Sequence, residues 1–122
     1  MNTQRQVIFY KHYFTDFYLE QTDKVQEKIE HIFKVIRNVQ NVPKKFLEHI
    51  SGTDGLYEIR IEFESNIYRI FCCFDKGNFV VLFNGFQKKT QKTPKTPKTQ
   101  IDLALKLKDE YFNTKWKENG NK

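Results

Sequence analysis

Three short apolar segments, separated by gaps of hairpin length, constrain the fold of this chain more than any other feature. The segments are residues 56–63, 67–74 and 79–85, and the gaps are 64–66 and 75–78. The second gap contains Gly beside Asn, which is typical of a tight turn between neighbouring strands. The pattern therefore predicts an antiparallel meander of three strands.

Side chains alternate between the two faces of a strand, so the two faces of the predicted meander can be compared. One face is apolar, and we expect it to be buried against helices. The other is partly polar and carries Arg60 and Arg69 near its middle. These arginines lie five and four residues from Ser65 at the turn, so they are predicted to be near neighbours on an exposed face. A register slip of one residue would separate them.

Helical periodicity occurs on both sides of the meander. A capping Thr22 precedes an apolar stripe whose spacings of three and four predict a helix. The stripe consists of Val25, Ile29, Ile32, Phe33 and Ile36. A short strand at 7–10 and a weaker, aromatic-rich helix at 12–20 come before it. A short strand or irregular link is expected at 47–50, and a last helix from about 100 to 112.

The chain is therefore predicted to form one α+β domain over residues 1–113, followed by a polar, frayed tail at 114–122. In this prediction the N-terminal helices pack on a small antiparallel β-sheet, and a C-terminal helix follows. Of the 122 residues, 39% are hydrophobic and 16% aromatic. Aromatic side chains bury a large area each, so this composition supports a core without disulfides or metal.

Cysteine use and hydropathy indicate a soluble, cytoplasmic protein. Cys72 and Cys73 are adjacent on a predicted strand and point to opposite faces, so we expect two reduced thiols. No Cys/His spacing suggests zinc, and no cofactor is expected. The N-terminus is polar, and no apolar run approaches the ~20 residues of a transmembrane helix.

A lysine-rich segment follows the last predicted strand. Residues 86–99 contain five lysines and no acid, and the chain has a formal net charge of +6. Such a segment at the end of a rigid sheet is a natural phosphate-binding edge, although a solvated linker has the same composition. Ribosomal RNA, mRNA, DNA and an acidic protein all fit this charge as partners.

Four sequence motifs occur in a specific order and spacing. They are G-L-Y-E-I-R at 55–60, N-I-Y-R-I-F at 66–71, L-F-N-G-F-Q-K-K-T-Q-K-T-P at 82–94 and I-D-L-A at 101–104. Over roughly residues 7–112 the chain resembles the phage Gp49-like, HigB-type branch of the RelE/ParE toxin superfamily. The resemblance implies a RelE-like microbial RNase fold.

The resemblance also implies a function and partners. It implies the toxin of a type II toxin–antitoxin system, a metal-independent endoribonuclease that cuts mRNA in the ribosomal A site. Ribosomal RNA and a helix-turn-helix antitoxin are the implied partners, with no membrane involved. Two departures from the family are visible. The loop carries a three-residue Lys-Thr-Pro insertion, and nothing corresponds to the His/Asp/His group of some HigB-type enzymes.

The chemistry of metal-free RNA cleavage suggests roles for five residues. Arg60 and Arg69 are expected to hold the scissile phosphate and its developing charge. Lys88 or Lys89, crowded among cations, is expected to have a lowered pKa and to act as base or acid. Tyr68 is a candidate for stacking or proton donation, but alternation turns it away from Arg69, which favours a place in the core.

The candidate RNA-binding residues are Phe86, by stacking, and Lys92, Lys95 and Lys98, by phosphate contacts.

Alternatives remain open at this stage. Arg60 would equally suit an ion pair with Glu58 or Glu62, and Arg69 one with Glu62. For function, the alternatives are a ParE-like non-nuclease that binds a protein target such as gyrase, or an inert RNA-binding phage regulatory module.

Overall fold

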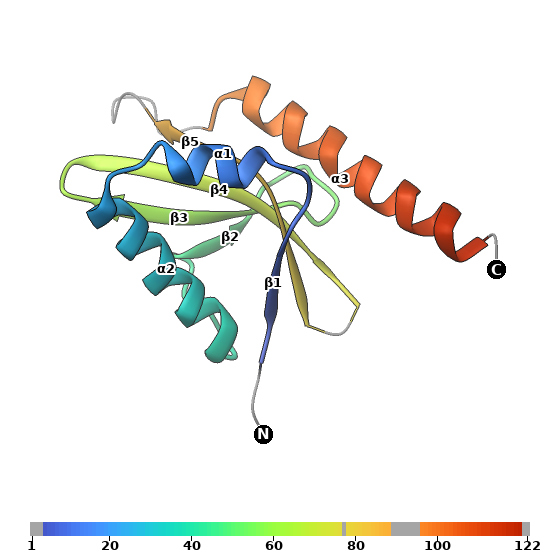
Figure 1. The fold of residues 1–122 in the computed structure, drawn as a ribbon, viewed down its shortest axis with the longest axis horizontal. Coiled ribbons are helices and arrows are strands. Elements are labelled where there is room, and N and C mark those ends of the chain that lie inside the picture. Colours follow the sequence, from blue (N-terminus) through green and yellow to red (C-terminus); the bar gives the residue numbers. More distant parts are fainter. Residues whose placement is uncertain (1–3, 77, 89–95, 121–122) are drawn as a thin grey trace.

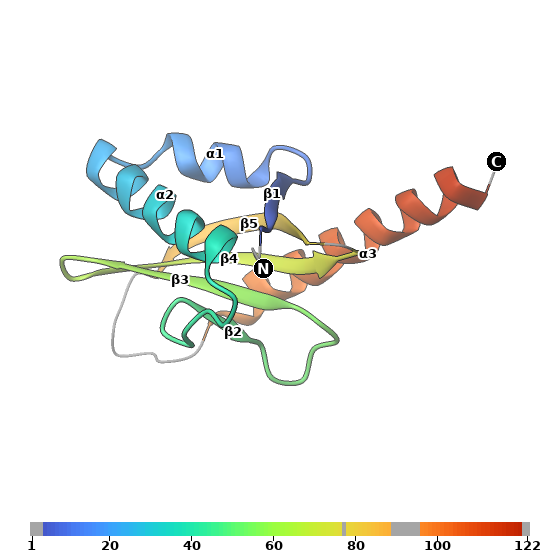
Figure 2. The same ribbon diagram turned by 90° about the horizontal axis from the view of Figure 1, so that it is seen from below.

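The computed structural model describes residues 4–76, 78–88 and 96–120 of the chain. A five-stranded sheet lies between two layers of helices (Figures 1 and 2). Helices α1 (Tyr13–Leu19) and α2 (Asp23–Asn38) cover one face. The first half of α3 (Lys98–Gly120) covers the other. The predicted α+β class, with N-terminal helices on the sheet and a C-terminal helix, is confirmed.

The strand order is β1-β5-β4-β3-β2. The predicted meander is present as β3 (Tyr57–Phe63), β4 (Asn66–Asp75) and β5 (Phe79–Lys88), all antiparallel. The short β2 (Leu47–His49) extends it beside β3. The opening strand β1 (Gln6–Phe9) pairs with β5 in parallel, which makes the sheet mixed.

A β-bulge interrupts the pairing of β4 and β5. Ile70 lies opposite Gly85, and Cys72 lies opposite Leu82, so β5 has one more residue than β4 between these pairs. Such an extra residue lets two consecutive side chains point to the same face. Here they are Phe83, which joins the core beneath α3, and Asn84, which donates a hydrogen bond to α3.

The sheet separates two apolar cores. The core beneath α1 and α2 includes the predicted α2 stripe with Ile59 and Ile61, and the core beneath α3 includes Phe71 and Leu107. The face predicted to be exposed is therefore covered by α3 around Leu56, Phe71 and Cys73, whereas Glu62 on the same face is exposed.

The two cysteines lie in different cores, as alternation predicts. Cys72 belongs to the core beneath α1 and α2, and Cys73 to the core beneath α3. Both thiols are free. Burial raises the pKa of Cys73 to about 12 and raises that of Cys72 as well, so neither thiol is a reactive nucleophile in the folded protein.

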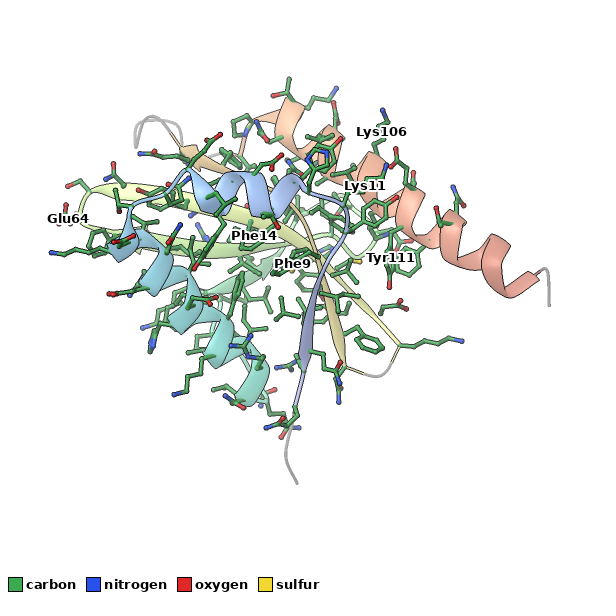
Figure 3. All side chains as sticks on the ribbon, viewed as in Figure 1. Phe9, Lys11, Phe14, Glu64, Lys106 and Tyr111 are labelled. Atoms are coloured by element: carbon green, nitrogen blue, oxygen red, sulfur yellow. The ribbon has the colours of Figure 1, made fainter. Side chains whose placement is uncertain are left out.

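Side-chain contacts explain where α2 begins and how α3 is held. Thr22 caps α2 by accepting a hydrogen bond from the Val25 amide at 3.3 Å, as predicted. Around the middle of α3, Lys11 Nζ lies 2.7 Å from a Glu110 carboxylate oxygen, and the Tyr111 hydroxyl donates to Asp75 at 2.6 Å. Figure 3 labels the Lys11 and Tyr111 side chains beside this helix.

The C-terminal helix is longer than the sequence pattern predicts. It runs to Gly120, through most of the segment expected to be a frayed tail, and projects beyond the sheet (Figures 1 and 2). No Pro or Gly interrupts residues 98–119, so the backbone can remain helical after the apolar stripe ends. None of the helices in the described residues combines the length and apolarity needed to cross a membrane.

Gly85 allows α1 to lie directly on β5. A Cβ atom at this position would come within 2.8 Å of Phe17 Cδ2, closer than packed atoms normally approach. Phe17 is buried and packs edge-on against Tyr68, so its ring has little freedom to move away.

We expect Gly85→Ala to lower the free energy of unfolding by about 1–3 kcal/mol, because the added methyl overpacks this contact. Urea denaturation measures the effect. Combining Gly85→Ala with Phe17→Leu tests its cause, since the double variant should lose less stability than the sum of the single variants. Additive losses would contradict the proposed clash.

Candidate functional site

Arg60 on β3 and Arg69 on β4 face each other in the sheet. They are register partners, so the prediction that they are near neighbours on one face is confirmed. Like charges directly opposite in a sheet are destabilising. Here the Glu58 carboxylate compensates, because its Oε2 atom lies 3.6 Å from Nε of each arginine. At this distance the contacts are ion pairs rather than hydrogen bonds of fixed geometry.

Further polar contacts complete the cluster. Arg60 Nη1 donates to Glu48 Oε2 on β2 at 2.7 Å, and the Thr96 hydroxyl donates to Glu58 Oε1 at 2.8 Å. We call Glu48, Glu58, Arg60, Arg69 and Lys88 the arginine–glutamate cluster. The alternative that Arg60 pairs with Glu58 is thus observed, whereas the carboxylate paired with Arg69 is that of Glu58 rather than Glu62.

The two arginines differ in exposure. The Arg60 side chain is 32% exposed, whereas Arg69 as a residue is only 4% exposed. The expectation that both lie on an open face is therefore wrong for Arg69. Burial lowers the pKa of Arg69, and the charge of Glu58 opposes this shift. The Arg60 side chain can contact a ligand that arrives from solvent. The buried Arg69 influences the cluster through its charge and its ion pair with Glu58.

Lys88 ends β5 on the same face as the arginines. Its pKa is lowered, as predicted, first by burial and then by the charge of Arg69. The prediction attributed this shift to crowding by cations, but partial desolvation contributes more. Lys98 is the exposed first residue of α3.

Three predicted site residues, Lys89, Lys92 and Lys95, lie outside the described residues.

The two aromatic candidates lie on opposite faces of the sheet. Tyr68 is 4% exposed in the core beneath α1, and burial raises the pKa of its hydroxyl. The structure therefore does not bring Tyr68 to the arginine–glutamate cluster, and the core interpretation is confirmed. Phe86 lies opposite Arg69 in the sheet. Its ring stacks on that of Phe71, with 5.9 Å between the ring centroids and an interplanar angle of 19°.

A cavity of about 690 Å³ opens between α1, β5 and the start of α3. Phe86 and Lys88 line it, so the cavity adjoins the arginine–glutamate cluster. Asn84 also lines it and is tied to α3, because its Nδ2 donates to the backbone oxygen of Gln100 at 3.2 Å and to Gln100 Oε1 at 3.1 Å.

Sequence reasoning did not identify Glu48, Glu58, Thr96 or Asn84 as site residues. Alternation places Glu58 on the same face as Arg60, and this signal was sufficient to include it. Thr96 reaches Glu58 across 38 positions in the sequence, and no local pattern predicts such a contact.

The cluster can bind an anion and exchange protons. Arg60 and Lys88 are cations near the surface, while Glu58 and Lys88 can accept or donate a proton. Within the described ranges, no group of three or more His, Cys, Asp or Glu side chains is arranged to hold a metal ion.

Comparison with known protein families identified the family of this chain. The family model for phage-derived protein Gp49-like (DUF891) matches residues 16–109. This span contains α2, strands β2 to β5 and the first half of α3. It therefore includes the whole cluster and all of the cavity lining except Tyr13. No curated protein matched the sequence.

We expect Glu58→Gln to lower the free energy of unfolding by about 2–4 kcal/mol, because it leaves two opposed arginines without their shared countercharge. Glu48→Gln is the matched control. Its carboxylate is 43% exposed, so the loss should stay below about 1 kcal/mol.

Urea denaturation at low and high salt measures both losses. The loss for Glu58→Gln should shrink in high salt, which screens the repulsion between the arginines. Equal, salt-independent losses for the two variants would contradict the role assigned to Glu58.

Proposed function

The chain belongs to the phage-derived Gp49-like protein family, and on this premise we propose that it is the toxin of a type II toxin–antitoxin system. In this proposal it is a metal-independent endoribonuclease that cuts mRNA on the ribosome and thereby inhibits translation. One observation carries the proposal: two arginines in register share a single carboxylate beside a lysine of lowered pKa.

This arrangement supports a functional site because it is unfavourable for stability alone. Two guanidinium groups directly opposite each other repel, and Arg69 is also largely removed from water. Charged residues held in such surroundings cluster at catalytic and binding sites. Anion binding benefits from the same concentration of positive charge.

The proposed reaction uses the 2′-hydroxyl of the RNA as nucleophile. Glu58 accepts the hydroxyl proton, and the 2′-oxygen forms a bond to phosphorus. Arg60 neutralises the negative charge that develops on the phosphate oxygens. Arg69 positions Glu58, and its positive charge further stabilises the transition state. The bond from phosphorus to the 5′-oxygen breaks, and Lys88 donates a proton to this leaving oxygen. The products are a 2′,3′-cyclic phosphate and a free 5′-hydroxyl.

The ion pairs of the free protein are compatible with substrate binding. Glu58 lies 3.6 Å from each arginine, beyond hydrogen-bond distance, so these pairs leave donor capacity for a phosphate. The short bond from Arg60 to Glu48 lies at the surface, where a phosphate can compete for the same Nη1 donor.

The proposed partners follow from charge and from the ribosome-dependent reaction. The net charge of +6 favours ribosomal RNA, with Lys92, Lys95 and Lys98 as candidate phosphate contacts. The ribosome would hold the mRNA in the A site and supply much of the orientation that the reaction needs. A helix-turn-helix antitoxin would inhibit the toxin by covering the cluster. A reaction on ribosomes would place the protein in the cytoplasm.

One observation favours a second candidate function. Both arginines already have carboxylate partners, and Arg69 is only 4% exposed, so the cluster also suits a purely structural role. In that case the protein would be a ParE-like toxin that binds a protein target such as gyrase without cutting RNA.

Primer extension on a translated message after induced expression tests the proposal. We expect cuts in this message and none in the same message without its start codon. Arg60→Ala should reduce cutting roughly 100-fold or more, because it removes a donor that stabilises the transition state.

Lys34→Ala is the matched control, since it removes an equal charge from the exposed face of α2 and should cut like the wild type. Undiminished cutting by folded Arg60→Ala would refute the assigned site. Growth arrest with intact mRNA and halted DNA replication would favour the ParE-like alternative.

A further inference from the structure

We propose that the outer edge of β5, within the cavity between α1 and α3, is the docking site for an extended, acidic peptide segment of a partner protein, which adds to the sheet as a further strand. The inference rests on the proposed function for the identity of this partner, which is then the antitoxin. It adds to the arginine–glutamate cluster a surface through which the cluster is covered.

The second half of β5 has no strand on its outer side. The pairing of β1 with β5 ends at Leu82, whose carbonyl accepts one last bond from the Tyr10 amide. The chain then turns away into α1 through Lys11, whose φ of 58° is left-handed (Figure 1). Since β5 continues to Lys88, its outer edge over residues 84–88 is uncovered by the described strands. We call this stretch the open edge.

The hydrogen bonds of the sheet show which backbone groups of β5 point to the open edge. The Arg60 amide donates to the Phe46 carbonyl, away from β4. Arg60 and its register partner Arg69 are therefore a pair without mutual hydrogen bonds. The backbone groups of Arg69 then face β5, where Phe86 is the register partner, and those of Phe86 face β4.

Gly85 and Gln87, on either side of Phe86, therefore turn their N–H and carbonyl groups to the open edge. Both residues line the cavity, and Gly85 has no side chain, so its contribution to the lining is main chain. Within the described ranges, no backbone hydrogen bond from outside the ladder of β4 and β5 reaches either residue. Donors and acceptors two residues apart match the backbone of an added strand, whereas an RNA phosphate only accepts.

The walls of the cavity suit the side chains of an added strand. Tyr13 and Phe17 of α1 lie on one side of the open edge, and Leu103 of α3 lies on the other. Successive side chains of a strand point to opposite faces, so both faces of the added segment would meet apolar surface. We therefore expect consecutive apolar residues in the docked segment.

The charge around the cavity favours an acidic segment. Lys88, Pro97 and Thr99 line the cavity, so both ends of the lysine-rich segment meet there. Residues 86–99 contain five lysines and no acid, and the net charge of the chain is +6. Glu20 is the one acid among the described lining residues. Acidic residues beside the apolar run of the partner would therefore be attracted to this face.

The position of the open edge connects docking with inhibition. Lys88 ends β5 and belongs both to the cavity lining and to the arginine–glutamate cluster. A segment that continues past Lys88 is led to the cluster, where its acidic side chains can replace Glu48 as the partner of Arg60. Because the proposed reaction needs the same arginine, docking and cleavage would exclude each other.

Hydrogen exchange of the ¹⁵N-labelled full chain tests the open edge before any partner is added. The Phe86 amide should exchange slowly, because it faces β4, and the Gln87 amide should exchange at least about tenfold faster. Equal protection of the two amides would overturn the inference, because the edge would already be paired.

A synthetic peptide then supplies the strand. The probe is a capped run of valines flanked on both sides by aspartates, and it should protect the Gly85 and Gln87 amides from exchange. N-methylation of the valine amides removes the donors of the probe, and lysines in place of the aspartates reverse its charge. Each of these control peptides should bind at least about tenfold more weakly.

Two variants separate the backbone of the open edge from its side chains. Gln87→Pro removes an outward donor and leaves the bonds to β4, and proline is tolerated on a strand edge. It should bind the peptide at least about tenfold more weakly. Gln87→Ala is the matched control, which keeps the amide and should bind like the wild type. Should Gln87→Pro fail to fold, the comparison of the plain with the N-methylated peptide on the wild type decides.

The outcomes separate this inference from the proposed function. Equal binding of the plain and N-methylated peptides would overturn the inference even if the protein cuts mRNA. Protection of the same amides by oligouridylate, but not by the peptide, would assign the open edge to RNA and overturn it as well. Peptide docking at the open edge of a protein that leaves mRNA intact would uphold the docking site and refute only the proposed nuclease activity.

Discussion

The extra residue in β5 determines how the two helical layers meet the sheet at the candidate site. Before the bulge, β5 pairs with β1, and this pairing ends at Leu82. After it, Gly85 faces α1, while Asn84 faces α3. A regular strand would alternate these side chains differently and move Phe86 away from the face that carries Arg69. The cavity and the arginine–glutamate cluster therefore both depend on this one irregularity.

The charges of the cluster act together rather than as separate pairs. Glu58 faces two arginines at once and also accepts a hydrogen bond from Thr96, at the start of the segment that leads into α3. Lys88 adds a third cation, whose pKa is lowered chiefly because it is partly removed from water. Loss of one partner therefore changes the balance of charge around all the others.

Local periodicity predicted the elements that depend on neighbouring residues. The apolar stripe of α2, the meander, the core position of Tyr68 and the pairing of Arg60 with Arg69 all follow from repeats of 3.6 or 2 residues and from turn lengths. The motifs at 55–60 and 82–94 indicated the family that the comparison confirmed.

Features that depend on distant contacts were not predictable in this way. The parallel pairing of β1 with β5 joins segments about 70 residues apart, and no local signal selects that partner. The burial of Arg69 was not predictable from alternation, which shows only that Arg69 lies on the partly polar face of the meander. The only sequence signal of the bulge is weak: Gly85 interrupts the apolar pattern of the strand.

The carboxylates of the cluster compete with the phosphates of a nucleic acid for the same arginines. When unpaired protein cations neutralise the phosphates of a nucleic acid, the counterions condensed on the nucleic acid are released, and this release drives binding. Arg60 instead exchanges one anionic partner, Glu48, for another, so a lone phosphate gains little. If the ribosome holds the mRNA beside the cluster, its phosphate competes at high effective concentration. On the proposed function, the cluster would then discriminate against unattached anions, although the chain as a whole is strongly cationic.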